Sequence, residues 1–303
     1  HILDGARETA VRGAAPLAPR MGEDDGVLLR GQLRQGLPQG GGRSATHVRG
    51  DGAHQALAEL QGLACQAQAE VTESLRCNPA NGRAYYFQSM IDQLQGRYQE
   101  SIPSLTAALR YYPQDAMYYG NRGYAYYMIK DFPKSLADLN QALALEPNNS
   151  LLLNNRCNTL WELGENEKAL ADSNRVTQMY PNSAYPHFVR GQIYSQMKEY
   201  AKAIDEFTLS LTKGQDAANV SSSYYNRGNC HAHRAEYELA LADYDAALAL
   251  KEDFYYYNNR GLVNLELKRY DRSRDDFHKA LNLKPGDKDV LANLKILDKL
   301  TKK

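Results

Sequence analysis

The chain has 303 residues, with 36 basic and 36 acidic side chains and therefore no formal net charge. This balance does not favour binding to nucleic acid or to an anionic lipid surface. No apolar run is long enough to span a bilayer and nothing near the start resembles a signal peptide, so we expect a cytoplasmic protein. The four cysteines lack the spacing of metal or redox pairs, which fits a reducing compartment (Cys65, Cys77, Cys157, Cys230).

Residues 1–50 are rich in Gly and Arg and show no sustained helical period. Such a segment buries too little apolar surface to offset the entropy of ordering it, so we expect it to be flexible or irregular. From His54 to Cys77 the apolar residues fall on one helical face, and Pro79 follows where the helix should end. Residues 51–81 are therefore either an atypical first repeat or a single packing helix.

The following residues repeat with a period of 34, as the segments that begin at Tyr119, Tyr225 and Asn258 show. A unit of this length holds two short helices and a turn, but it buries its apolar face only by stacking on neighbours. We place six units at 82–115, 116–149, 150–183, 184–220, 221–253 and 254–287. The eighth position of each is small and would let the two helices approach closely (Ser89, Gly123, Cys157, Gly191, Gly228, Gly261).

The second helix of each unit has its own pattern. A small residue stands at position 20, and a large apolar residue usually follows four positions later (Leu105, Leu139, Phe207, Tyr244, Phe277). Position 17 is an aromatic residue that should wedge at the turn between the helices (Tyr98, Phe132, Tyr200, Tyr237, Tyr270). Proline closes four of the units, because it stops a helix (Pro113, Pro147, Pro181, Pro285).

Two units depart from this pattern. The 150–183 unit has Asn166 in place of the turn aromatic and Ser173 in place of the large apolar residue. We therefore expect it to be the least tightly packed of the six units. The 184–220 unit is three residues longer and lacks the closing proline. Its Gly214 is suited to end a helix, and we predict that Gln215–Val220 forms a protruding loop.

The last segment, 288–303, is predicted to be a capping helix and a short tail. Its apolar residues should face inward (Val290, Leu291, Leu294, Leu297) and its lysines outward (Lys288, Lys295, Lys299). A stacked array needs such a polar-backed helix to cover its last apolar face.

The period and the recurring positions resemble the tetratricopeptide repeat (TPR) family over residues 82–287, about two thirds of the chain. The resemblance implies an all-α fold, a right-handed α-solenoid of helix-turn-helix repeats with a C-terminal capping helix. It further implies that the chain binds another protein and is not an enzyme, with no cofactor. The resemblance is specific for the fold but not for the partner.

A pair of oppositely charged residues recurs at fixed positions in the repeats. Five units carry Arg at position 7 and an acid sixteen residues later (Arg122/Asp138, Arg156/Asp172, Arg190/Glu206, Arg227/Asp243, Arg260/Asp276), and the 82–115 unit has lost both charges together, with Gln88 and Ser104. We therefore expect an ion pair between the two helices of one unit. The alternative is two independently solvated charges.

The family pattern places positions 2, 5, 9, 12 and 13 of each first helix on the concave groove. These positions are aromatic and amide-rich, which suits the backbone of an extended peptide or a partner helix. The candidate groove residues are Tyr86, Tyr124, Tyr127, Asn154, Asn158, Trp161, Tyr185, Phe188, Gln192, Tyr225, Asn229, Tyr255 and Asn258. Packing between repeats is an equal alternative for the aromatic ones. It is the expected role of the tyrosines at positions 4 and 11 (Tyr85, Tyr119, Tyr126, Tyr194, Tyr224, Tyr257).

Other site types are not expected. The heat-shock-protein clamp of some TPR co-chaperones needs lysines that this groove lacks, and Val189 and Ser222 replace its amide and its cation. Cys230, His231 and His233 stand close together, but their spacing puts the two histidines on different helix faces, so we predict no metal site. No P-loop, nucleophile elbow or dinucleotide motif is present.

Two functions remain open at this point. The first is a scaffold or adaptor without catalytic activity, which binds a peptide segment or helix of a partner in the concave groove. The alternative is a structural subunit of a larger assembly, held through its outer face, the 215–220 loop or the N-terminal tail. Shape alone does not name a partner.

Overall fold

The computed structural model describes residues 67–213 and 217–301. The predicted flexible segment 1–50 and the proposed cap at Gly214 lie outside these residues. All regular structure in the described part of the chain is α-helical. Packing divides the chain into two compact units whose border in the sequence is between Glu146 and Pro147.

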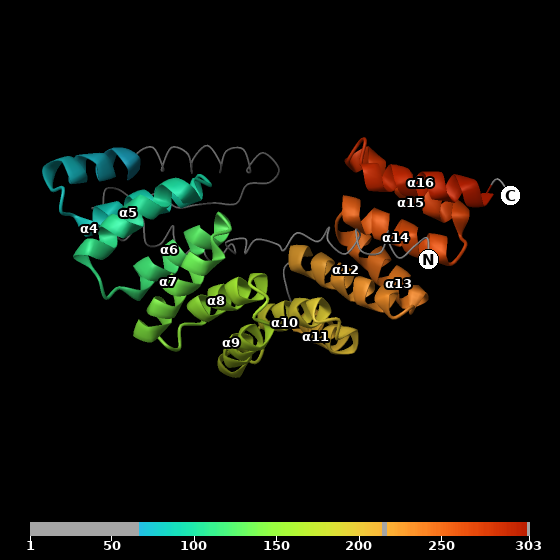
Figure 1. Ribbon diagram of the computed structural model, residues 1–303, viewed down its shortest axis with the longest axis horizontal. Helices are drawn as coiled ribbons and strands as arrows, with labels where there is room; N and C mark the ends of the chain where they lie inside the picture. The colour runs from blue at the N-terminus through green and yellow to red at the C-terminus, as the bar shows by residue number, and fades with distance from the viewer. Residues whose placement is uncertain (1–66, 214–216, 302–303) are drawn as a thin grey trace, which may run out of the picture. The chain divides into compact units, whose positions relative to one another are not determined.

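The described part of the first unit consists of helical residues 67–77 and four further helices. These are α4 (Gly82–Leu94), α5 (Tyr98–Tyr111), α6 (Ala116–Met128) and α7 (Phe132–Leu145). Each packs on the next along the chain (Figure 1). Tyr86 and Tyr118 stack with ring centroids 4.8 Å apart, within a cluster that also buries Met90, Leu105 and Leu109. Val71 is buried as the sequence pattern for the preceding helix requires.

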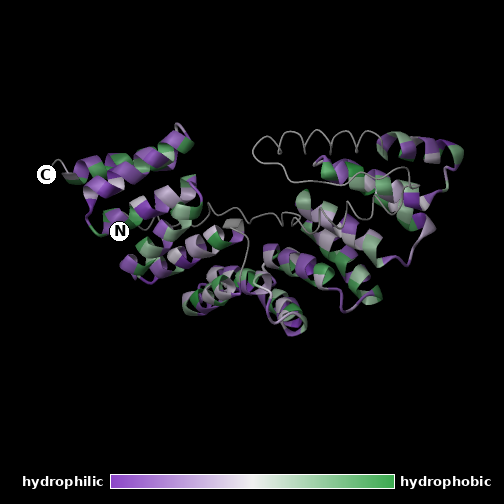
Figure 2. Ribbon diagram, turned by 180° about the vertical axis from the view of Figure 1, so that it is seen from behind, coloured by the Kyte–Doolittle hydropathy of each residue, from purple (hydrophilic) through white to green (hydrophobic). Residues whose placement is uncertain are grey.

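The second unit continues the same alternation. Its helices are α8 (Ser150–Glu162), α9 (Asn166–Met179), α10 (Tyr185–Gln196), α11 (Tyr200–Thr212), α12 (Ala217–His233), α13 (Tyr237–Leu250), α14 (Phe254–Glu266), α15 (Tyr270–Leu283) and α16 (Lys288–Thr301). Consecutive helices pack on each other, and each first helix also touches the first helix of the next pair. This is the arrangement of an α-solenoid. Every helix mixes polar and apolar residues, as Figure 2 shows.

Side-chain caps start most of the first helices. Asn81, Asp115, Asn149 and Asp253 each accept hydrogen bonds from backbone N–H groups of the first turn. These bonds satisfy donors that have no partner within the helix. Helix α10 lacks such a cap and has Pro186 in its first turn instead, where the missing N–H costs nothing.

The turn between the two helices of a hairpin always places its residue at position 15 in the left-handed region. The backbone φ lies between 58° and 76° at these six positions (Gly96, Lys130, Gly164, Lys198, Ala235, Lys268). Only two of the six are glycine, so the repeated hairpin imposes this conformation on residues that rarely adopt it.

Close approach of the helices depends on the small residue at position 8. A Cβ atom on Gly191 would lie 2.7 Å from Phe207, and one on Gly261 would lie 2.8 Å from Phe277. In the 150–183 repeat, position 8 is larger than glycine and position 24 is smaller than in the other repeats. Cys157 here lies opposite Ser173. Both are buried, and each donates to a backbone oxygen, Cys157 to Ala169 at 3.1 Å and Ser173 to Pro186 at 3.1 Å.

The predicted loop at Gln215–Val220 is wrong for its described part, because α12 begins at Ala217. The three extra residues of this unit lengthen the helix: α12 has 17 residues, whereas α14 has 13. The segment contains no helix breaker after Gly214, and alanine favours the helix.

Helix α16 covers the last hairpin. Val290 and Leu297 are fully buried against Phe277 and Tyr257, and Leu294 packs on the same cluster. The predicted inward position of Leu291 is wrong, since this side chain is 40% exposed. Asn293 takes the inner face instead, and its amide donates to Asn258 Oδ1 at 3.3 Å. The three lysines point outward as expected.

Candidate functional site

Six of the thirteen candidate groove residues are buried between helices (Tyr86, Tyr127, Asn158, Phe188, Tyr225, Asn258). Phe188 packs on Phe207 with ring centroids 5.9 Å apart, and Tyr225 stacks on Tyr256 at 4.5 Å. Burial raises the pKa of Tyr86 to about 12 and the pKa of Tyr225 further still. These side chains pack within and between repeats, so they are not available to a partner at the surface.

Amides on α12 and α14 are occupied by bonds within the protein. Asn229 Oδ1 accepts from the Tyr244 hydroxyl at 2.7 Å and from Asn259 Nδ2 at 2.9 Å. Asn259 Nδ2 also donates to the Tyr225 hydroxyl at 3.0 Å, and Asn258 accepts from α16 as described above. The resulting chain of amides and hydroxyls links neighbouring first helices. It is a structural network, although the residue types are those of a peptide-binding surface.

The remaining candidates are half-buried on their first helices (Tyr124, Asn154, Trp161, Tyr185, Gln192, Asn229, Tyr255). Tyr185 is held in place, because Asn158 Nδ2 donates to its hydroxyl at 3.0 Å. Burial also raises the pKa of Tyr185 to about 12, which keeps this hydroxyl neutral. Asn154 and Gln192, in contrast, form no side-chain hydrogen bond to any described residue.

All five predicted arginine–acid pairs form. Arg122 binds Asp138 through two nitrogen–oxygen contacts of 2.7 and 2.8 Å, and Arg227 binds Asp243 at 2.9 and 2.6 Å. The geometry is the two-pronged one that a guanidinium makes with a carboxylate. The acids are largely buried, and the hydrogen bonds that Arg122 donates to Asp138 raise the pKa of Arg122. The charges are therefore paired rather than independently solvated.

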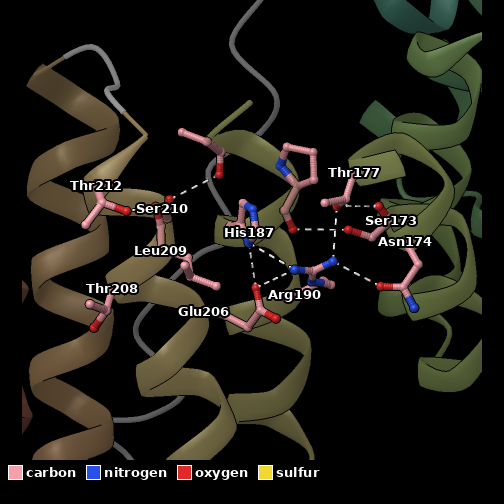
Figure 3. Close-up of polar contacts among 12 residues, drawn as sticks. Ser173, Asn174, Thr177, His187, Arg190, Glu206, Thr208, Leu209, Ser210 and Thr212 are labelled. Atoms are coloured by element: carbon pink, nitrogen blue, oxygen red, sulfur yellow. Dashed lines mark hydrogen bonds and ion pairs between the residues drawn. The ribbon is translucent and has the colours of Figure 1, made fainter. Parts of the chain in front are cut away.

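Four of these arginines also reach the second helix of the preceding repeat, which the sequence did not predict. Arg122 Nη1 donates to Thr106, Arg227 Nη1 to Thr208 and Arg260 Nη1 to Asp245. Figure 3 shows the most elaborate case, Arg190. Its Nη2 meets Glu206 at 2.8 Å and His187 at 2.9 Å, while Nη1 donates to Asn174 at 3.0 Å and Thr177 at 3.1 Å. Each of these four guanidinium groups thus joins three helices.

Several of the tyrosines expected to pack lie over these arginines. The guanidinium carbons of Arg122, Arg227 and Arg260 are 5.5 to 5.7 Å from the ring centres of the tyrosines three residues before them (Tyr119, Tyr224, Tyr257). Such cation–π contacts add to the ion pairs. These rings therefore belong to the repeat joints and not to a free surface.

Cys230, His231 and His233 each contact a different residue and do not converge on one point. Cys230 is buried and donates to Ser195 at 3.6 Å, His231 contacts Glu236 at 2.7 Å, and His233 stacks on Tyr200. Among the described residues, no group of three or more His, Cys, Asp or Glu side chains is placed to hold a metal ion. Burial raises the pKa of Cys230 to about 11 and that of Cys157 to about 12, so both are poor nucleophiles.

Two buried polar atoms in the 150–183 repeat lack a described hydrogen-bond partner, Trp161 Nε1 and Asn166 Oδ1. Sequence reasoning treated Asn166 only as a weakness in the turn. The replacement of the aromatic residue was nevertheless visible in the sequence. A polar side chain at a packing position needs a hydrogen-bond partner, so this replacement marked Asn166 as unusual.

Comparison with known proteins agrees with this architecture. Three family models, each described as tetratricopeptide repeat, match residues 95–150, 184–212 and 254–287. The chain contains tetratricopeptide repeats at these three segments. A search of curated proteins by sequence found no match. None of the helices in the described TPR array is long and apolar enough to cross a membrane.

Several solved TPR structures are similar to this chain. One is a TPR protein from Parabacteroides merdae, with a TM-score of 0.62, 21% identity, and coverage of 78% of this chain and 93% of that one. Another is the Cut9–Hcn1 hetero-tetramer of the APC/C, with a TM-score of 0.65 and 13% identity, where 78% of this chain matches only 46% of that chain. A third is YrrB, described as a TPR protein with an unusual peptide-binding site, with a TM-score of 0.50, 18% identity, and coverage of 66% and 97%. At these identities the likeness concerns the fold alone.

Proposed function

We propose that this TPR protein is a scaffold or adaptor without catalytic activity, and that it holds a peptide segment of a partner protein on the first-helix surface of α8 and α10. One observation carries the proposal. Asn154 and Gln192 are half-buried and uncharged, and their amides form no hydrogen bond to a described residue. An amide that both donates and accepts complements the backbone of an extended peptide.

The positions of these side chains support a shared surface. Asn154, Asn158 and Trp161 recur at spacings of four and three on α8, so they lie on one helix face. Tyr185 and Gln192 are seven residues apart on α10 and also share a face. The Asn158–Tyr185 hydrogen bond of 3.0 Å joins the two faces.

The low charge of this surface suggests a ligand with little charge. Five exposed or half-buried members of the two faces are uncharged (Leu151, Asn154, Trp161, Tyr185, Gln192), and Glu162 at the end of α8 is acidic. The two positions that would complete a heat-shock-protein clamp, Val189 and Ser222, are buried, which argues against an acidic C-terminus as the ligand. The described peptide-binding site of the TPR relative YrrB is consistent with a peptide ligand.

A display library of random dodecapeptides, selected on the full chain, tests the proposal. Peptides that bind should lose affinity for the double variant Asn154→Ala/Gln192→Ala, which should fold normally because neither amide has an internal partner. Leu239→Ser is the matched control, since Leu239 is 54% exposed on the second helix α13. Peptides that depend on Leu239 and ignore the double variant would contradict the proposal and favour an outer-face contact.

A further inference from the structure

Three tyrosines lie together in the first unit, where the end of α5 meets the start of α4. The rings of Tyr85 and Tyr111 are nearly parallel, with centroids 6.4 Å apart and an interplanar angle of 5°. Gly82 allows this approach, since a Cβ atom there would lie 2.8 Å from Tyr111 Cβ and 2.8 Å from the ring of Tyr112. Tyr111 and Tyr112 nevertheless remain 46% and 41% exposed, so a ligand can reach both rings. We call Tyr85, Tyr111 and Tyr112 the tyrosine edge.

The rings of the tyrosine edge are held by contacts within the protein. The hydroxyl groups of Tyr85 and Tyr111 donate to the same acceptor, the backbone oxygen of Pro79, at 3.2 and 3.5 Å. Tyr112 packs edge-on against the buried ring of Tyr118, with centroids 5.9 Å apart. Only the 82–115 repeat has aromatic residues at both positions 30 and 31. Exposed rings that are already fixed lose little conformational entropy when a partner binds, and they mark an interaction surface.

The tyrosine edge offers hydrogen-bond donors and a positive charge. The Tyr112 hydroxyl forms no hydrogen bond to a described residue. Arg83 is exposed on α4, and its guanidinium likewise forms no hydrogen bond or ion pair within the described ranges. Burial raises the pKa of Tyr118 and the charge of Arg83 opposes this rise, so the guanidinium lies near the ring on which Tyr112 packs. A guanidinium only donates, so a matching ligand presents acceptors and a negative charge.

We propose that the tyrosine edge binds a proline-rich segment of a partner protein in the polyproline II conformation, with an acidic residue of that segment paired to Arg83. Proline has a carbonyl oxygen but no N–H, so a run of prolines presents acceptors without donors. Its rings pack on aromatic faces, and its backbone is extended before it binds. This site belongs to the first unit and does not depend on the α8–α10 surface.

The charge of the chain argues against single-stranded nucleic acid, the other ligand that stacks on exposed aromatic rings. Such a ligand needs a positively charged groove along its backbone. The chain has 36 basic and 36 acidic side chains, and the arginine that precedes Arg83 in the sequence, Arg76, is already paired with Glu73 at 2.6 Å. One available guanidinium suits one carboxylate rather than a row of phosphates.

Fluorescence anisotropy of labelled peptides, titrated with the full chain, tests the proposal. The probe is an oligoproline that ends in two aspartates. One matched peptide replaces every proline by glycine, and another replaces both aspartates by lysines. We expect saturable binding of the probe, no measurable binding of the glycine peptide, and about five-fold weaker binding of the lysine peptide.

Variants assign the binding to the tyrosine edge. Arg83→Glu alters an exposed side chain, so the fold should be kept, and it should reverse the preference for the aspartate peptide over the lysine peptide. Tyr111→Ala/Tyr112→Ala should weaken the probe at least about ten-fold. If circular dichroism shows that this double variant is unfolded, Tyr112→Phe replaces it, because the ring stays and only the hydroxyl is lost, with an expected loss of about five-fold.

Tyr180→Ala is the matched control for the tyrosine variants. Tyr180 is 53% exposed and stands at position 31 of its repeat, as Tyr112 does, but Met179 precedes it in place of a second tyrosine. This variant should bind the probe as tightly as the wild-type chain. Equal weakening by Tyr180→Ala would overturn the assignment to the tyrosine edge.

Other results would also overturn the proposal. These are equal binding of the proline and glycine peptides, or unchanged binding by both the Arg83 and the tyrosine variants. Tighter binding of oligothymidylate than of the probe would assign the surface to nucleic acid. A dimer seen by sedimentation velocity, lost in the tyrosine variants and accompanied by no peptide binding, would assign it to a second copy of the chain. The variants at Asn154 and Gln192 test the proposed function separately, so either proposal can fail while the other stands.

Discussion

The 150–183 and 221–253 repeats share a helical hairpin and an arginine–acid pair, but they differ in how they use their polar residues. In 221–253, Gly228 faces the buried ring of Tyr244, and the Tyr244 hydroxyl donates to Asn229. In 150–183, Cys157 faces Ser173, and polar groups on the first-helix side remain without described partners. The comparison shows that residue type and repeat position alone do not mark a binding surface, because internal pairing can use up the same groups.

The largest difference between the repeats should appear at position 24. Tyr244→Ala removes a fully buried ring and should lower the free energy of unfolding by about 3 to 5 kcal/mol. Ser173→Ala at the same position removes one hydrogen bond and should cost about 1 kcal/mol. Urea denaturation of both variants measures the two values. Similar losses would show that the two repeats are packed alike.

The next largest effect concerns the arginine–acid pair that the two repeats share. Arg227→Ala leaves Asp243 buried without its cation and should cost about 3 kcal/mol. Adding Asp243→Ala should restore part of this loss, because the unpaired carboxylate is then gone. A double-mutant cycle by denaturation measures the coupling. If the two losses simply add, the ion pair contributes nothing to stability. The same cycle at Arg156 and Asp172 checks whether the 150–183 repeat relies on its pair equally.

A smaller effect should separate occupied from unoccupied amides. Asn259→Ala breaks bonds to Tyr225 and Asn229 and should destabilise the protein by about 1 to 2 kcal/mol without changing peptide binding. Asn154→Ala should do the opposite, with stability changed by less than about 0.5 kcal/mol and binding weakened. Calorimetric unfolding together with titration of a selected peptide tests both halves. A stability loss in Asn154→Ala would mean that this amide has a structural role.

The smallest effect concerns the two buried thiols, one in each repeat. Their raised pKa values, about 12 for Cys157 and about 11 for Cys230, leave almost no thiolate at pH 8. We expect neither residue to react with iodoacetamide in the folded protein, and both to react in urea. Exposed Cys77 is the internal control. Mass spectrometry of the labelled peptides checks the result, and rapid labelling of Cys157 at pH 8 would show that the 150–183 repeat opens.

The repeat pattern predicted the hairpins well, because small and large residues recur wherever two helices must approach. The five ion pairs followed from the joint loss of both charges at Gln88 and Ser104. The site was predicted less well: Phe188 and Tyr225 face the neighbouring helix rather than a groove, and nothing in a single repeat shows how deeply the next repeat covers them. The side chain at position 25 accepts a hydrogen bond from the arginine of the following repeat. Because this residue is Thr, Asn or Asp in different repeats, its shared role as an acceptor was not visible in the sequence.

The three-helix contact of Arg122, Arg190, Arg227 and Arg260 makes the joints at these arginines interchangeable. Removing 221–253 would bring Arg260 beside Thr208, the hydroxyl that Arg227 now occupies. Conversely, a duplicated unit would meet a suitable acceptor on one side and offer one on the other. A gene for such a chain can gain or lose whole repeats while the arginines at these joints keep a hydrogen-bond acceptor on the preceding repeat. The length of the array can therefore change in evolution without other changes to the packing between repeats.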